Sequence, residues 1–296
     1  MTATISHDTG ARTGLFLGLG AYTMWGLLPL YLRLLREVPA MQVLGHRVLW
    51  SLLLLGVIVL VLGRGRAIVA AARGRTLLLL CASAALIAVN WYIYIWAIQS
   101  AHVLEASLGY FINPLVNVAL GMAVLGERIT RVQTAAIAVA GTGVAVMAVA
   151  GGGAIWVPLL LAVTFSLYGL VRKVVAVDAL GGLAIETMLL APPALAVILY
   201  AGDAGVFGRD MRIDLLLVGA GVATALPLLL FAAAARRLRY STLGLIQYIA
   251  PTLAFLQAVL LFGEPLRPVH LVTFALIWTG CAMYAWSSLR TPVPPL

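Results

Sequence analysis

The chain of 296 residues is 63% hydrophobic and only 10% charged, whereas soluble domains carry about 25% charged residues. This composition excludes an ordinary soluble domain and indicates a protein that lies mostly within a membrane. The formal net charge of +9 comes from basic residues that cluster between long apolar runs. Such clusters orient membrane proteins and meet anionic lipids, so the charge does not indicate nucleic-acid binding.

Ten apolar runs of roughly 17 to 25 residues follow one another, each long enough to cross the membrane as a helix. In chain order they are about 14–35, 40–62, 77–98, 104–125, 132–150, 155–172, 181–201, 214–235, 241–262 and 269–289. The sixth run is short, and the seventh contains Pro192-Pro193, which membrane helices tolerate because neighbours satisfy the freed carbonyl. The sequence therefore predicts an all-α membrane protein with ten transmembrane helices.

The regions outside these runs are short. Residues 1–13 form a polar N-terminal tail, and residues 290–296 form a C-terminal tail. The first apolar run is too long for the hydrophobic part of a cleavable signal, so we interpret it as the first membrane helix. Cys81 and Cys281 both fall inside predicted spans, where they are expected to pack as small apolar residues rather than form a disulfide.

The basic residues predict the orientation, because loops on the cytoplasmic side are enriched in arginine and lysine. With ten spans and a cytoplasmic N-terminus, the cytoplasmic segments contain Arg12, Arg64, Arg66, Arg73, Arg75, Arg128, Arg131, Arg172, Lys173, Arg236, Arg237, Arg239 and Arg290. The opposite side contains Arg33, Arg36, Arg209, Arg212 and Arg267. Both termini are therefore expected to be cytoplasmic, at the plasma membrane.

The two halves of the chain repeat one another. Pro114 with Gly126-Glu127 matches Pro251 with Gly263-Glu264, and Gly143 matches Gly280, each pair being 137 residues apart. The halves are residues 14–150 and 151–289, and each contains five predicted spans. Five is an odd number, so the second half enters the membrane from the opposite side. The sequence thus predicts a 5+5 inverted repeat, an arrangement typical of transporters.

Charged residues inside the spans are the first site candidates, because a charge in hydrocarbon usually faces a cavity or a partner. His46 and Arg47 lie about two turns into the second span, and Glu186 lies at a similar depth in the seventh, from the other side. We expect Arg47 to bind or gate an anionic group and Glu186 to bind a cationic group or a proton. His46 is a weaker candidate: histidine ordinarily titrates near neutral pH, but many such histidines are hydrogen-bonded structural residues. The alternative is that these residues bond to loop backbone or to each other, or snorkel to the interface.

Glutamates at the ends of spans are interpreted differently. Glu105 opens the fourth span, where the helix dipole favours an acid, and it is a second candidate for proton coupling. Glu127 and Glu264 each follow a glycine at the end of a span. They are expected to help turn the chain at the interface rather than to bind solute.

Polar and aromatic residues near the membrane midplane complete the predicted solute site. Pro114 and Pro251 interrupt two of the spans and free upstream carbonyls, which either bond to nearby amides and phenols or face a solute. Transporters built from repeats bind solute at such interrupted helices. The further candidates are Asn90, Trp91, Tyr94, Tyr110, Asn113, Gln247 and Tyr248. For each aromatic residue, plain packing between helices is the competing interpretation.

Several segments resemble the RarD branch of the EamA family, in the drug/metabolite transporter superfamily. They are His46–Ser51, Leu104–Pro114, Tyr168–Lys173, Ile185–Met188 and Arg237–Gly244. The resemblance runs from about Gly14 to about Trp286. It implies a ten-helix permease of the bacterial inner membrane with both termini cytoplasmic, and it implies little about the solute. The loop at 202–214, rich in Asp and Arg, departs from the pattern and has no assigned role.

The sequence contains no phosphate-binding loop, no His-Glu-x-x-His helix and no nucleophile elbow, so it predicts neither an enzyme nor a metal or cofactor site. The leading hypothesis is a secondary-active permease for small metabolites or drug-like solutes that works by alternating access, with proton exchange as one source of energy. A passive channel or facilitator and a membrane-embedded lipid-handling protein remain as alternatives. The expected partners are membrane lipids, a small-molecule solute and protons.

Overall fold

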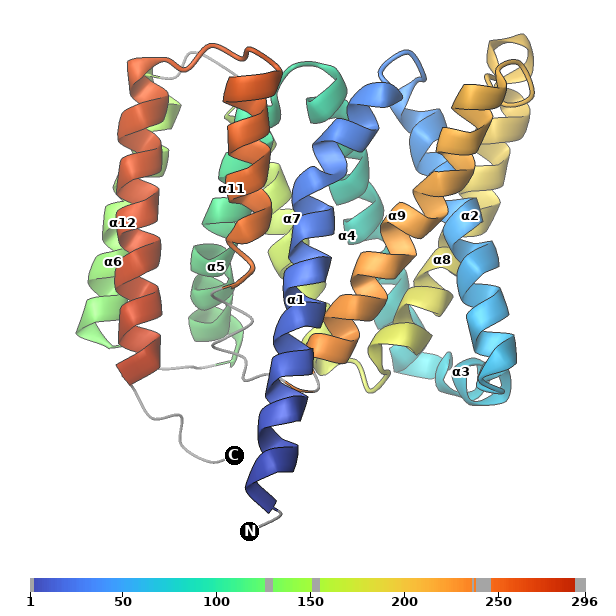
Figure 1. The fold of residues 1–296 in the computed structure, drawn as a ribbon, viewed down its shortest axis with the longest axis horizontal. Coiled ribbons are helices and arrows are strands. Elements are labelled where there is room, and N and C mark those ends of the chain that lie inside the picture. The colour runs from blue at the N-terminus through green and yellow to red at the C-terminus, as the bar shows by residue number, and fades with distance from the viewer. Residues whose placement is uncertain (1–2, 126–129, 151–154, 236, 238–245, 291–296) are drawn as a thin grey trace.

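The computed structural model describes residues 3–125, 130–150, 155–235, 237 and 246–290, and the elements within them are helices arranged as one bundle (Figure 1). No strand occurs in this part of the chain, which confirms the all-α prediction. The helices are α1 (Ala3–Leu34), α2 (Ala40–Val61), α3 (Gly65–Ala71), α4 (Gly74–Gln99), α5 (Val103–Leu125), α6 (Arg131–Ala150), α7 (Trp156–Val174), α8 (Ala179–Tyr200), η1 (Gly202–Ala204), α9 (Met211–Ala235), α11 (Ile249–Leu256), η2 (Gln257–Leu261) and α12 (Pro268–Arg290).

Among the described residues, seven helices are long and apolar enough to cross a membrane. They are the helical segments Arg12–Leu34, Ala40–Val61, Gly74–Gln99, Val103–Val124, Arg131–Ala150, Ala179–Tyr200 and Met211–Phe231. Shorter apolar helical segments occupy Trp156–Arg172, Ile249–Leu261 and Pro268–Tyr284. A helix therefore lies within each range in which the sequence predicted a span, and Pro192-Pro193 are contained inside α8.

Two features near the first half differ from the sequence prediction. Helix α1 begins at Ala3, inside the predicted polar tail, because a helix that leaves the hydrocarbon can continue in water with polar side chains. The short helix α3 was not predicted. Its buried residue Ile68 belongs to one hydrophobic cluster with Val59 and Ile185, and α3 packs on α8 although it is too short to span a membrane.

The ninth predicted span, 241–262, is also different in structure. Residues 241–245 lie outside the described part of the chain, Gln247 and Tyr248 form a turn, and α11 begins at Ile249. Pro251 thus lies in the first turn of α11, where a missing N–H removes no helical hydrogen bond. The interruption expected at Pro251 is found four residues earlier. The π-helix η2 then continues α11, with Phe262 N donating to Gln257 O at 2.8 Å.

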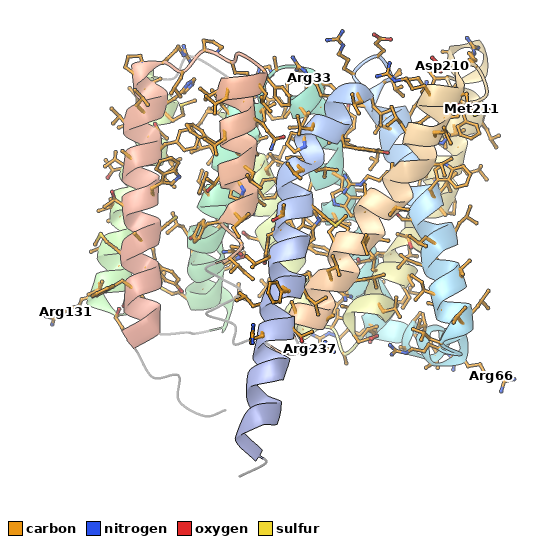
Figure 2. The ribbon with its side chains drawn as sticks, viewed as in Figure 1. Arg33, Arg66, Arg131, Asp210, Met211 and Arg237 are labelled. Atoms are coloured by element: carbon orange, nitrogen blue, oxygen red, sulfur yellow. The ribbon has the colours of Figure 1, made fainter. Side chains whose placement is uncertain are left out.

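The two ends of the bundle carry different charged residues. Arg66, Arg131 and Arg237 lie at the end where α1 begins and α12 finishes, which we call the N-terminal face (Figure 2). Arg33 and Asp210 lie at the other end, which we call the distal face. The long helices run alternately between these two faces (Figure 1).

The helices of the two halves are interleaved rather than separate. Helix α1 packs on α9 and α11, and α7 packs on α4 and α5. Helix α2 packs on α8 and α9, and α8 also packs on α4. Helices α6 and α12 pack side by side at one edge of the bundle (Figure 1). The hydrophobic core is therefore built jointly by both halves of the chain.

Two glycines allow the close contact of α6 and α12. A Cβ atom on Gly143 would lie 3.0 Å from Thr273 O, and a Cβ atom on Gly280 would lie 2.6 Å from Ala136 O. Small residues permit such approach between membrane helices, whose association depends on van der Waals packing. The contact is supported by Thr273 Oγ1, which donates to Gly143 O at 3.3 Å.

Replacing Gly280 with alanine should therefore destabilise the protein by about 1–3 kcal/mol, because the added methyl overpacks the interface. Gly141 is the matched control: it also lies on α6, and a Cβ there would meet nothing within 4 Å. Gly141→Ala should be neutral or slightly stabilising, since alanine is favoured over glycine in a helix. Thermal unfolding of the purified variants measures both effects. Equal melting temperatures for the two variants would contradict this account of the interface.

Candidate functional site

Arg47 is a buried cation whose hydrogen-bonding groups are only partly satisfied. Helix α2 places its side chain inside the bundle, where it is 5% exposed. Its Nε donates to Thr224 Oγ1 of α9 at 2.5 Å. Its Nη1 is buried without a hydrogen-bond partner among the described residues. The ion pairs found in that part of the chain, Arg64–Asp178 and Arg172–Glu186, do not include it.

Aromatic rings surround this guanidinium. The Cζ atom of Arg47 lies 4.6 Å from the centre of the Trp91 ring, and a desolvated cation–π contact is worth about 2 kcal/mol. The phenols of Tyr31, Tyr94 and Tyr110 are close enough to interact with Arg47 electrostatically. The Tyr31 hydroxyl donates to Leu216 O. Arg47 therefore lies in an aromatic environment that stabilises its charge without neutralising it.

Asn90 and Tyr110 form a hydrogen-bonded network beside this cluster. The Asn90 amide donates to Leu161 O and to Thr164 Oγ1, both at 3.0 Å. Tyr110 Oη donates to Asn90 Oδ1 at 3.3 Å, and the Tyr110 ring contacts the Tyr94 ring edge to face at 5.4 Å. Asn90 thus joins α4 to α7 and positions Tyr110, so its observed role is structural.

Glu186 lies in a second polar cluster. It is 1% exposed on α8 and accepts hydrogen bonds from Ser83 Oγ at 2.6 Å and from Tyr168 Oη at 3.3 Å. Arg172 Nη1 lies 3.8 Å from its Oε1. The Glu186 carboxylate is therefore stabilised by side chains of α4 and α7, and it is not paired with Arg47.

The remaining predicted residues are spread over the bundle. His46 is buried, and its ring stacks on Phe207 at 5.0 Å, so it contacts the loop before α9. Glu105 lies in the first turn of α5. Asn113 is buried, with its side-chain oxygen unpaired among the described residues. The structure describes only the backbone at Pro114, which continues α5.

Gln247 and Tyr248 lie at the turn before α11. Gln247 is half-buried, and its carbonyl accepts from Ala250 N at 3.3 Å. The Tyr248 ring stacks on the Phe111 ring at 6.0 Å. The Tyr248 contact is packing against α5, the competing interpretation for an aromatic residue in a membrane helix, whereas the Gln247 bond is local to the turn.

The structure adds residues that the sequence did not single out. Thr224, Ser83 and Thr164 complete the polar clusters, and their hydroxyls also bond backbone carbonyls of their own helices. Isolated Ser and Thr residues are common in membrane helices, so no local pattern marks them. No group of three or more His, Cys, Asp or Glu residues that could hold a metal is present among the described residues.

An apolar cavity of about 600 Å³ lies between α2, α4, α7 and α8. Its lining includes Met41, Val89, Trp156 and Pro193. None of the predicted site residues lines it. Met41, Val89 and Trp156 are each more than one-third exposed, so the cavity opens to the surface of the bundle.

Comparison with known proteins identifies the family. The model of the EamA-like transporter family matches residues 12–149. Protein RarD of Escherichia coli strain K12 is 44% identical over 95% of this chain and 96% of its own length. An uncharacterized transporter of Vibrio cholerae is 43% identical over 95% of this chain and 94% of its own. A crystal structure with 20% identity matches with a TM-score of 0.64, covering 95% of this chain and 99% of that one, which shows a shared fold. The chain belongs to the RarD branch of the EamA family and is a multi-pass membrane transporter.

Proposed function

We propose that the protein is a secondary-active permease that moves a small organic anion across the bacterial inner membrane by alternating access. Arg47 is the anion site, and Trp91, Tyr94 and Tyr110 line it. Glu186 binds the coupling proton. The observation that carries this proposal is the buried Arg47 guanidinium, which has an unpaired Nη1 and no carboxylate partner among the described residues.

The energetics of Arg47 support a ligand. Insertion measurements give a cost of about 2.5–3.5 kcal/mol for an arginine at the centre of a membrane helix. The bond to Thr224 and the contact with Trp91 offset part of this cost, but they leave the positive charge in place. A bound carboxylate would pair with the fork of N–H groups that arginine presents. Intramembrane charges that are not paired within the protein typically mark solute pathways.

The helix packing supports ten spans in a 5+5 inverted repeat. The repeat pairs α1 with α7, α2 with α8, α4 with α9, α5 with α11 and α6 with α12. Exchanging the two members of every pair preserves the main contacts between helices. The contact α1–α9 becomes α7–α4, α1–α11 becomes α7–α5, and α2–α9 becomes α8–α4. Such exchange is what a two-fold axis between related halves requires. The family model, which matches residues 12–149, covers little more than the first of these halves.

The glycines of α6 and α12 support the same symmetry in atomic detail. Gly143 faces Thr273 O, and Gly280 faces Ala136 O. The two glycines are 137 residues apart in sequence, and so are Ala136 and Thr273. Each glycine therefore meets the residue that the repeat assigns to it, as at an interface between two copies of one unit.

The arginines support the orientation. The N-terminal face carries Arg66, Arg131 and Arg237 (Figure 2), and the rule that cytoplasmic loops are enriched in basic residues assigns this face to the cytoplasm. Glu186 lies about two turns from the N-terminal face along α8, and Arg47 lies about two turns from the distal face along α2. In an inverted repeat, these two positions flank the central region from opposite sides.

Thermal shift of the purified protein tests the choice of solute class. The panel contains short aliphatic and aromatic carboxylates, amino acids, nucleosides, sugars and amphenicols. We expect carboxylates to raise the melting temperature in proportion to the logarithm of their concentration above the dissociation constant, and we expect neutral sugars to have no effect. Stabilisation by neutral or cationic solutes with no response to any carboxylate would refute an anion site.

A further inference from the structure

Glu264 is a buried carboxylate that links the two halves at the distal face. It lies in the turn between η2 and α12 and is 6% exposed. Its Oε1 accepts a hydrogen bond from Val103 N, and its Oε2 accepts one from Leu104 N, both at 2.9 Å. Val103 and Leu104 are the first two residues of α5. The carboxylate of the second half therefore caps a helix of the first half.

The local backbone holds Glu264 in this position. Gly263 has a φ of 66°, a left-handed conformation that glycine adopts without strain, and Glu264 N donates to Ala258 O at 2.9 Å. Phe262 precedes Gly263, and the Cζ atom of Arg33 lies over its ring, 5.0 Å from the ring centre. The end of η2 is thus tied to α1 and to α5, both from the first half.

The capping bonds depend on the charge of Glu264. Backbone N–H groups at a helix N-terminus favour a carboxylate, because the helix dipole places partial positive charge there. A protonated carboxyl group would place a hydroxyl donor against one of these N–H donors. Burial is the main cause of a raised pKa at the Glu264 carboxyl, and the nearby charge of Glu105 also raises this pKa. The hydrogen bonds from Val103 and Leu104, and the charge of His102, lower it in part.

Other titratable groups gather around this contact. Glu105 lies in the first turn of α5, and His102 precedes that helix. On the other element, Arg267 N donates to His270 Nδ1 at 3.3 Å. Glu105 and Arg267 both interact electrostatically with His270. The distal end of α5 therefore meets a cluster of ionisable groups supplied by both halves.

We propose that Glu264 is a latch that holds the distal face closed, and that a proton arriving from the distal side releases it by breaking the bonds to the N-terminus of α5. Glu264 is thus a positioning residue for the conformational step and does not touch the solute. This inference rests on the proposed function, because a contact between the two halves at one face must break only if the halves move relative to each other during transport.

The latch differs from a simple helix cap in what its loss exposes. A cap that serves only stability would leave α5 packed on α11 and α12 when it is removed. A latch, when released, opens the surface between them. Ser107 reports on this surface, because it is fully buried and lies one helical turn from both Val103 and Phe111 on the same face of α5. Phe111 packs against Tyr248 and Phe274.

The test measures labelling of Ser107→Cys by a membrane-impermeant thiol reagent applied to the distal side of cells or sealed vesicles. Cys81→Ser and Cys281→Ser remove the native thiols, and the same background without Ser107→Cys gives the baseline. We expect slow labelling when Glu264 is present and faster labelling, by roughly tenfold or more, when Glu264→Gln removes the two charged hydrogen bonds. Glu37→Gln, at an exposed glutamate in the turn after α1, is the control and should leave the rate unchanged.

The pH dependence gives a second arm. Lowering the pH on the distal side should raise the labelling rate of the S107C protein relative to that of the Glu264→Gln variant with the same cysteine, a ratio that cancels the loss of reactive thiolate at low pH. A lower melting temperature of Glu264→Gln without faster labelling would show a plain helix cap and overturn the proposal. A ratio of the two labelling rates that does not change with pH would overturn it as well. The experiment uses no solute, so its failure leaves the anion-permease proposal standing.

Discussion

Replacing Arg47 with glutamine should abolish stabilisation by carboxylates while leaving the solute-free protein as stable as before, or more stable. The first effect follows because removing one partner of a buried charge pair typically costs 2–5 kcal/mol of binding, about 30-fold or more in affinity. The second follows because an unpaired buried charge is a cost to folding, and its removal relieves that cost. Thermal unfolding with and without carboxylate measures both effects on the same samples.

The opposite signs separate a binding role from a structural one. An arginine that stabilises the fold through Thr224 and Trp91 would, when replaced, lower the melting temperature without solute. Arg36→Gln is the matched control, because Arg36 is exposed in the turn after α1 and should change neither property. Arg47→Lys should bind weakly, since an ammonium keeps the charge but loses the planar fork of donors.

Replacing Glu186 with glutamine should uncouple flux from the pH gradient. In proteoliposomes, an imposed pH gradient should drive net accumulation of the carboxylate through the parent protein, and it should drive none through Glu186→Gln. The buried carboxyl is bonded to Ser83 and Tyr168, and a glutamine amide can occupy the same space while remaining neutral at every pH. Exchange of solute at equal pH should persist, because it does not require a proton to be bound or released.

Two comparisons make this prediction specific. Glu37→Gln, an exposed glutamate in the turn after α1, should leave the response to the pH gradient intact. Glu105→Gln tests the other acid that the sequence proposed for coupling. A pH response that survives Glu186→Gln but disappears in Glu105→Gln would move the proton site to the start of α5. A parent protein with no response to pH would show facilitated diffusion.

The sequence predicted the helices well because their signal is local. Each apolar run of sufficient length specifies a helix regardless of its neighbours, so ranges such as 40–62 and 77–98 agree closely with α2 and α4. The short helix α3 was missed because a seven-residue segment between two spans carries no such periodic signal. The sequence predicted the helix interruption at Pro251 rather than at Gln247 and Tyr248, because a proline indicates the position of a break only to within about one helical turn.

The candidate site could be predicted only in part, for a different reason. The depth of Arg47 and Glu186 follows from counting residues within their own helices. Their partners do not, since Thr224 is 177 residues from Arg47 and Ser83 is 103 residues from Glu186. Glu264 was expected only to help turn the chain, because the N–H groups that it caps belong to a helix 160 residues away. Contacts of that range are determined by packing and carry no local signature.

Solute counterflow in proteoliposomes tests the central claim, a carrier with Arg47 as its anion site, most directly. The probe is the carboxylate that gives the largest thermal shift, labelled outside and present in excess unlabelled form inside. The account predicts saturable accumulation of label by the parent protein and by Arg36→Gln, and loss of this accumulation in Arg47→Gln. Flux that rises without saturation would indicate a channel, and counterflow of undiminished rate in Arg47→Gln would contradict the assigned site.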